Sequence, residues 1–108
     1  SPGHVDDALE REFAGEVFDR ACRPAGIGRQ FKASRADRSR TERLRLLHVP
    51  TLVIHGDRDT LIDISGGLRT AEVIPNARFI EVNGMGHDYP EYFWPNLVSA
   101  VRKHCQNI

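Results

Sequence analysis

Two short groups of polar residues in this chain have the types and spacing that acid–base chemistry needs. Asp57 and Asp59 come directly after the apolar run 51–54, and His87 comes soon after the largely apolar run 79–82. A carboxylate that accepts a hydrogen bond from one imidazole nitrogen fixes the tautomer of the ring, and the other nitrogen can then take a proton from a hydroxyl group. The pattern predicts that Asp59 is the acid and His87 the general base of a hydrolytic triad.

The elements that must position these residues are two strands and the helix between them. Residues 50–55 are β-branched and apolar without alternation, which predicts a strand covered on both faces of a parallel sheet. Residues 65–74 predict a helix, and residues 78–82 predict a second strand in which Glu81 points to the other face, as at a sheet edge. The carboxyl ends of parallel strands share one edge of the sheet, so we expect Asp59 and His87 to meet there.

The end of the chain predicts a helix over 90–106, or a pair of helices broken at Pro95. Strand, helix, strand and helix in this order form a parallel crossover unit, which places the chain in the α/β class. One side of the last helix is apolar, and an aromatic cluster at its start is interpreted as its packing side. The apolar side consists of Trp94, Leu97, Val98, Val101 and Cys105, and the cluster of Tyr89, Tyr92, Phe93 and Trp94.

The first part of the chain predicts helices. A helix over 1–22, started by Ser1 and Pro2, would turn one apolar stripe to a single side. A second helix is expected over 24–33, and a short one over 40–47 that begins with a capping box of Ser39 and Glu42. The stripe consists of Val5, Leu9, Phe13, Val17 and Ala21.

Five arginines lie between residues 35 and 45. They could form a phosphate-binding strip, but acidic residues interrupt them and no aromatic residue is present to stack on bases, which favours a solvated linker.

Composition excludes several function classes. The chain has 108 residues, 40% of them apolar, and its 15 acidic and 15 basic residues leave no net charge. There is thus no electrostatic case for a nucleic-acid or membrane partner. No apolar run approaches the roughly 18 residues of a membrane-spanning helix, and no secretory signal is recognisable. We expect a cytoplasmic protein in which Cys22 and Cys105 are buried free thiols, with a disulfide between them as the alternative.

The nucleophile of the expected triad is missing from this sequence. A serine on a tight G-x-S-x-G turn is required, and Ser65 comes nearest, but Asp63 stands where the first glycine should be. Two parallel strands are also too few for a stable sheet, and the first strand would leave a row of backbone groups unpaired. We therefore expect either a piece of a larger α/β protein or a chain that pairs with its own copy.

From residue 49 to about residue 105 the chain resembles the C-terminal end of an α/β-hydrolase-fold enzyme. Gly56-Asp57-Arg58-Asp59 resembles the acid loop of that family, and Gly84-Met85-Gly86-His87 resembles its histidine loop. The segments between and after them resemble bacterial esterase-like members, including those similar to polyketide methylesterases. The resemblance implies that Asp59 is the acid, that His87 is the base, and that the serine precedes both in the chain.

The resemblance also implies the domain organisation. Residues 1–47 would be the end of a helical lid and a linker, and residues 48–108 the C-terminal part of the hydrolase core. The expected function is that of a serine hydrolase of carboxylic esters or related acyl compounds, with no metal or organic cofactor. This chain alone would be inactive, and its partners would be a small-molecule ester and the N-terminal half of the fold or a second copy. The alternative is a non-catalytic half-domain that assembles through its exposed strand edge.

Other polar residues near the two loops receive plainer interpretations. Asp57 is expected to brace the acid loop, with a role as alternate acid left open. Asp88 could contact His87 or cap the following helix, and capping is favoured. His55 is expected to be packed and hydrogen-bonded within its strand. The remaining histidines, expected at the surface and without metal-ligand spacing, are His4, His48 and His104.

Overall fold

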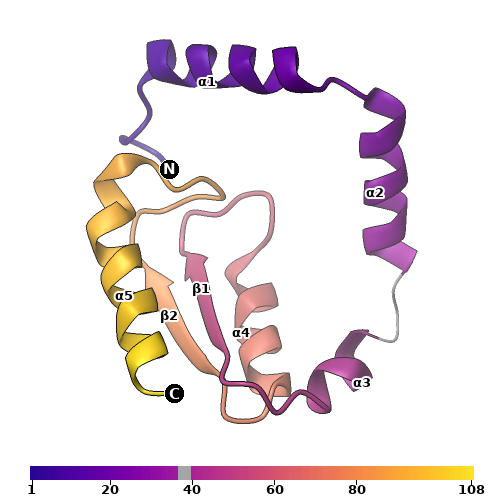
Figure 1. The fold of residues 1–108 in the computed structure, drawn as a ribbon, viewed down its shortest axis with the longest axis vertical. Coiled ribbons are helices and arrows are strands. Elements are labelled where there is room, and N and C mark those ends of the chain that lie inside the picture. Colours follow the sequence, from indigo (N-terminus) through magenta and orange to yellow (C-terminus); the bar gives the residue numbers. More distant parts are fainter. Residues whose placement is uncertain (37–39) are drawn as a thin grey trace. The chain divides into compact units, whose positions relative to one another are not determined.

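The computed structural model describes residues 1–36 and 40–108 and forms two compact units (Figure 1). One unit comprises Val5–Arg40, and the other combines Ser1–His4 with Thr41–Ile108. The arginine-rich segment and the predicted capping box fall partly on residues 37–39, which lie outside the described residues. In the described part of the chain, no helix is long and apolar enough to cross a membrane.

The first unit holds two helices, α1 (Asp7–Arg20) and α2 (Pro24–Ala36). The prediction that Ser1 and Pro2 start the first helix is wrong, because Asp6 is the N-cap and its carboxylate accepts hydrogen bonds from the N–H groups of Ala8 and Leu9. A short acceptor side chain satisfies N–H groups that the first helical turn leaves without partners, so the helix begins after Asp6. Leu9, Phe13 and Val17 of the predicted stripe lie in α1, whereas Val5 precedes the helix and Ala21 follows it, and no residue of the helix is buried.

The other unit holds all but the first residue of the short helix α3 (Arg40–Arg45). It also contains a parallel pair of strands, β1 (Leu52–Gly56) and β2 (Arg78–Val82). Helix α4 (Ile64–Val73) connects them, and a short 3-10 helix η1 (Glu91–Phe93) leads into α5 (Trp94–Gln106). Within the described residues the sheet has these two strands alone, in register from Leu52 opposite Arg78 to Gly56 opposite Val82. The predicted α/β class with a parallel strand–helix–strand unit is confirmed.

The two faces of the sheet pack against different helices. On one face the ring of His55 lies directly against Gly67 of α4. Successive side chains of a strand point to opposite faces, so Ile54 faces the other way, toward a cluster that includes Phe93 of η1 and Leu97 of α5. A core cluster therefore lies between the strands and the last helical segment. It consists of Val82, Met85 and Phe93, with Ile54, Ile80 and Leu97 packed against them. Val73 and Ile74 at the end of α4 are also buried.

Local chemistry explains the ends of the last two helices. Asp63 caps α4 by accepting a hydrogen bond from the N–H of Ser65, and the helix ends shortly before Pro75. Pro95 does not break α5 but lies in its first turn, where the missing N–H costs nothing. The predicted pair of helices is therefore a 3-10 turn followed by one continuous helix.

Two predictions about burial are wrong. Of the aromatic cluster only Phe93 is buried, at 2% exposure, whereas Tyr89, Tyr92 and Trp94 are at least half exposed. The apolar side of α5 is largely exposed too, because only Leu97 of this helix packs against the core cluster of the small sheet. Cys22 and Cys105 are free, as expected, but both are exposed rather than buried.

Candidate active site

The structure brings Asp59 and His87 into direct contact. Asp59 lies in the loop that follows β1, and His87 lies in the loop that follows β2, so both are at the carboxyl ends of the strands. Nδ1 of His87 is 2.8 Å from Oδ2 of Asp59. A carboxylate oxygen only accepts, so Nδ1 carries the proton of this hydrogen bond.

The carboxylate of Asp59 is held from both sides. Its Oδ1 accepts hydrogen bonds from the N–H groups of Leu61 and Ile62, each 2.9 Å long, and its side chain is only 5% exposed. Burial by itself would raise the pKa of Asp59, but the hydrogen bonds from Ile62, His87 and Leu61 outweigh burial and lower the pKa. The acid is thus ionised and oriented at neutral pH.

The acid loop and the histidine loop are tied together by hydrogen bonds. Oδ1 of Asp57 accepts from the N–H of Gly84 at 2.7 Å, and the N–H of Arg58 donates to the Met85 carbonyl at 2.9 Å. A side chain at Gly56 would overlap the same Met85 carbonyl, so the close approach of the loops requires glycine there. Asp57 therefore braces the loops, as predicted, and Asp59 is the carboxylate that contacts His87.

The ring of His87 is accessible from outside the protein. Its side chain is 53% exposed, while the carboxylate it binds is nearly buried. Because Nδ1 carries a proton toward Asp59, Nε2 of the neutral ring is left with a lone pair. This arrangement can take a proton from a hydroxyl group placed next to the ring.

Asp88 neither caps a helix nor contacts His87, so both interpretations of this residue are wrong. Its carboxylate accepts hydrogen bonds from the amino group and the hydroxyl of Ser1, and the Ser1 hydroxyl accepts one from the N–H of Gly86. The following 3-10 helix has Pro90 at its N-cap and no side-chain cap. Asp88 thus holds Ser1, which is distant in sequence, beside the histidine loop. No local sequence pattern indicates this contact.

His55 is packed and hydrogen-bonded, as predicted, with its side chain 11% exposed and Nε2 2.9 Å from the carbonyl of Ile62. The sequence interpretation missed a further contact, because Nε2 also lies 3.4 Å from Oδ2 of Asp59. In the sequence, this contact is indicated only by the position of His55, which immediately precedes the acid loop and lies four residues before Asp59.

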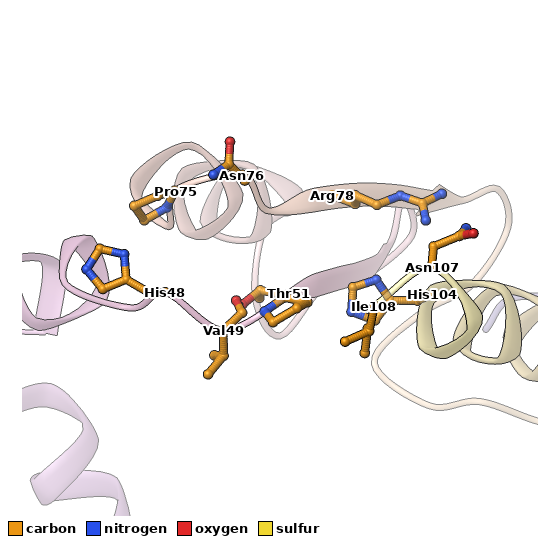
Figure 2. A pocket seen from close by; sticks show the side chains of 10 residues that line it. His48, Val49, Thr51, Pro75, Asn76, Arg78, His104, Asn107 and Ile108 are labelled. Carbon is orange, nitrogen blue, oxygen red and sulfur yellow. The ribbon is translucent and has the colours of Figure 1, made fainter.

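Two hollows of the described surface are lined by neither Asp59 nor His87. One of about 300 Å³ is formed at the amino ends of the strands, where Thr51, Arg78 and His104 contribute to its wall (Figure 2). Asp59 and His87 follow the opposite ends of the same strands. Among the described residues, no three His, Cys, Asp or Glu side chains are grouped as a metal site requires.

The described residues thus form a parallel β–α–β unit with a carboxylate after the first strand and a histidine after the second, joined by a hydrogen bond. No protein-family model matches the chain. A non-heme chloroperoxidase, CPO-A1 of Kitasatospora aureofaciens, is 42% identical over 48 residues, which are 44% of this chain and 18% of that protein. The crystal structure of the esterase RhEst1 from Rhodococcus sp. ECU1013 matches with a TM-score of 0.52 and 34% identity, over 58% of this chain and 23% of that one.

These two matches confirm the predicted resemblance to α/β-hydrolases. The chain spans about a fifth of the length of each of these relatives.

The lowered pKa of Asp59 predicts a pH dependence of stability. A carboxylate with a lower pKa in the folded state stabilises the fold above its ordinary pKa, and this contribution is lost as the pH falls through the folded-state value. We expect the difference in unfolding free energy between the natural chain and Asp59→Asn to shrink below about pH 4. Urea denaturation at several pH values measures it, and a difference that stays constant or grows toward pH 3 would contradict the assignment.

Proposed function

We propose that Asp59 and His87 are the acid and the base of a Ser-Asp-His triad in an α/β-hydrolase, and that the serine comes from polypeptide outside this sequence. The observation that carries the proposal is the 2.8 Å contact between Nδ1 of His87 and Oδ2 of Asp59 at the carboxyl ends of the strands. No serine of the chain lies in a G-x-S-x-G sequence.

In the proposed reaction, Asp59 fixes the His87 tautomer and stabilises the imidazolium that forms. Nε2 of His87 removes the proton of the serine hydroxyl as its oxygen attacks the acyl carbon, and then delivers that proton to the departing alcohol. Water, activated by the same ring, then releases the acid from the serine. The half-exposed ring of His87 is compatible with a nucleophile approaching from outside the described residues.

We propose carboxylic esters or related acyl compounds as the substrate class. The support is the structural likeness to an esterase at 34% identity. The chloroperoxidase relative shows that similar sequences also occur in a protein named for another reaction. Since one fold hosts several chemistries, hydrolysis of a chromogenic short-chain ester is the direct assay.

Labelling with a serine-directed fluorophosphonate distinguishes the chain from an enzyme that also contains the upstream nucleophile. We expect no labelling of the 108-residue chain, because an active-site probe reacts only with a serine that a neighbouring base activates. The enzyme encoded with an upstream G-x-S-x-G turn should label at that serine. Labelling of any serine in the 108-residue chain would contradict the proposed division of the triad, and mass spectrometry of the labelled peptide identifies the site.

A second candidate is a non-catalytic half-domain that assembles through a strand edge. Within the described residues β1 pairs only with β2, so its other edge presents unpaired backbone groups. The exposed apolar side chains of α5, such as Val98 at 64% exposure, are compatible with a further covering layer. Sedimentation measures whether the chain forms a stable dimer. A stable dimer would favour assembly if the chain extended by its upstream sequence also showed no esterase activity.

A further inference from the structure

His55 connects the end of β1 to the far side of the acid loop. Its Nε2 is 2.9 Å from the carbonyl oxygen of Ile62, seven residues further along the chain. The N–H of the same Ile62 donates to Oδ1 of Asp59. Both backbone groups of Ile62 are therefore occupied, one by the acid and one by His55.

The tautomer of His55 follows from its partner. A carbonyl oxygen only accepts, so Nε2 carries a proton. The same nitrogen is 3.4 Å from Oδ2 of Asp59, the oxygen that His87 also contacts. The positive end of the Nε2–H dipole thus lies beside the charged carboxylate, in a place where the two side chains are 11% and 5% exposed.

Helix α4 holds the ring of His55 in place. Its Gly67 is buried, and a Cβ there would overlap Nδ1 of His55 and come within 3.1 Å of its Cβ. The neighbouring Gly66 is different, because a Cβ there would approach only the side-chain Cγ2 methyl of Ile62, at 3.2 Å, and would not meet His55. Gly67 therefore provides the space that the imidazole occupies.

We propose that His55 is a positioning residue, which fixes the Ile62 backbone and thereby keeps the carboxylate of Asp59 on His87. The role rests on the proposed function, since positioning serves catalysis only if Asp59 and His87 act as a pair. His55 is not a catalytic residue in this proposal, because its Nε2 contacts Ile62 and Asp59 and not the reacting nitrogen of His87.

Nitrogen NMR of the imidazole rings tests the proposal on the full 108-residue chain. At about pH 9, where imidazoles are neutral, nitrogen chemical shifts give the tautomer ratio of each ring. We expect His87 as the Nδ1–H tautomer and His55 as the Nε2–H tautomer. His55→Phe keeps a ring but removes the donor, and should lower the Nδ1–H to Nε2–H ratio of His87 about three- to tenfold, the equivalent of one net hydrogen bond.

Two further comparisons keep the test decisive if His55→Phe unfolds the chain. His55→Gln retains an N–H near the position of Nε2 and should restore the His87 ratio. Gly67→Ala should lower it, whereas Gly66→Ala, which gains the same helix propensity, should not. Circular dichroism of each variant checks folding.

Each outcome separates the two proposals. An unchanged His87 ratio in folded His55→Phe or Gly67→Ala would overturn the positioning role and leave the proposed function intact. If the Asp59→Asn variant showed the same His87 ratio as the natural chain, Asp59 and His87 would not be paired in solution, which would overturn both proposals.

Discussion

His87→Ala is expected to lower kcat/KM for ester hydrolysis by about 10⁴-fold or more in the enzyme completed by its nucleophile. Without the imidazole, the proposed general base for the serine proton is absent, and the Nδ1 contact to Asp59 is lost as well. The ring is 53% exposed, so its removal should change stability by less than about 1 kcal/mol. Steady-state kinetics and urea denaturation of the same preparation measure both quantities.

The matched control is His48→Ala. His48 is an exposed imidazole that contributes to the hollow at the opposite ends of the strands. The same substitution there should leave kcat/KM within about twofold, as expected for a surface change far from the site. Near-normal turnover of His87→Ala would refute the base assignment, and an equal loss in both variants would indicate a general effect on folding.

Phe93→Ala is expected to destabilise the fold by about 3–5 kcal/mol. Phe93 is 2% exposed and belongs to the core cluster with Val82 and Met85. Removing its ring leaves a cavity between the sheet and the last helical segment, in a core with few other members to fill it. A small domain has little stability to spare, so the variant should be largely unfolded at 37 °C. Thermal denaturation followed by circular dichroism checks this.

Tyr92→Ala is the control for that prediction. Tyr92 is next to Phe93 in sequence but 68% exposed, and its ring stacks on His4 at 4.0 Å between centroids. Losing this contact should cost about 1 kcal/mol or less. A loss of stability in Tyr92→Ala as large as that in Phe93→Ala would show that burial of the ring does not decide the effect of removing it.

The pairing of Asp59 with His87 could be predicted because it depends on local patterns and one general rule. Each residue follows an apolar strand, and the carboxyl ends of parallel strands lie at one edge of a sheet. The contacts of Asp88 with Ser1 and of His55 with Asp59 could not be predicted in this way. The first joins residues 87 positions apart in the chain, and the second depends on how the acid loop folds back over the strand.

Burial was the least predictable property. A periodic apolar stripe shows which side of a helix can be covered, but it does not show whether a neighbour covers it. Helix α1 contains three residues of the predicted stripe and no buried residue, and α5 buries little of its apolar side. The exposed thiols of Cys22 and Cys105 have the same cause, because average burial preferences assume a complete core.

Sequence by itself determined the order of strands and helices in the α/β unit and the positions of Asp57, Asp59 and His87 at the strand ends, because strand and turn preferences act over a few residues. Tertiary structure alone decided that Asp57 binds Gly84, that His55 reaches Ile62, and that Phe93 fills the core. These contacts depend on distances between segments far apart in the chain, which only the packing of helices on the sheet establishes.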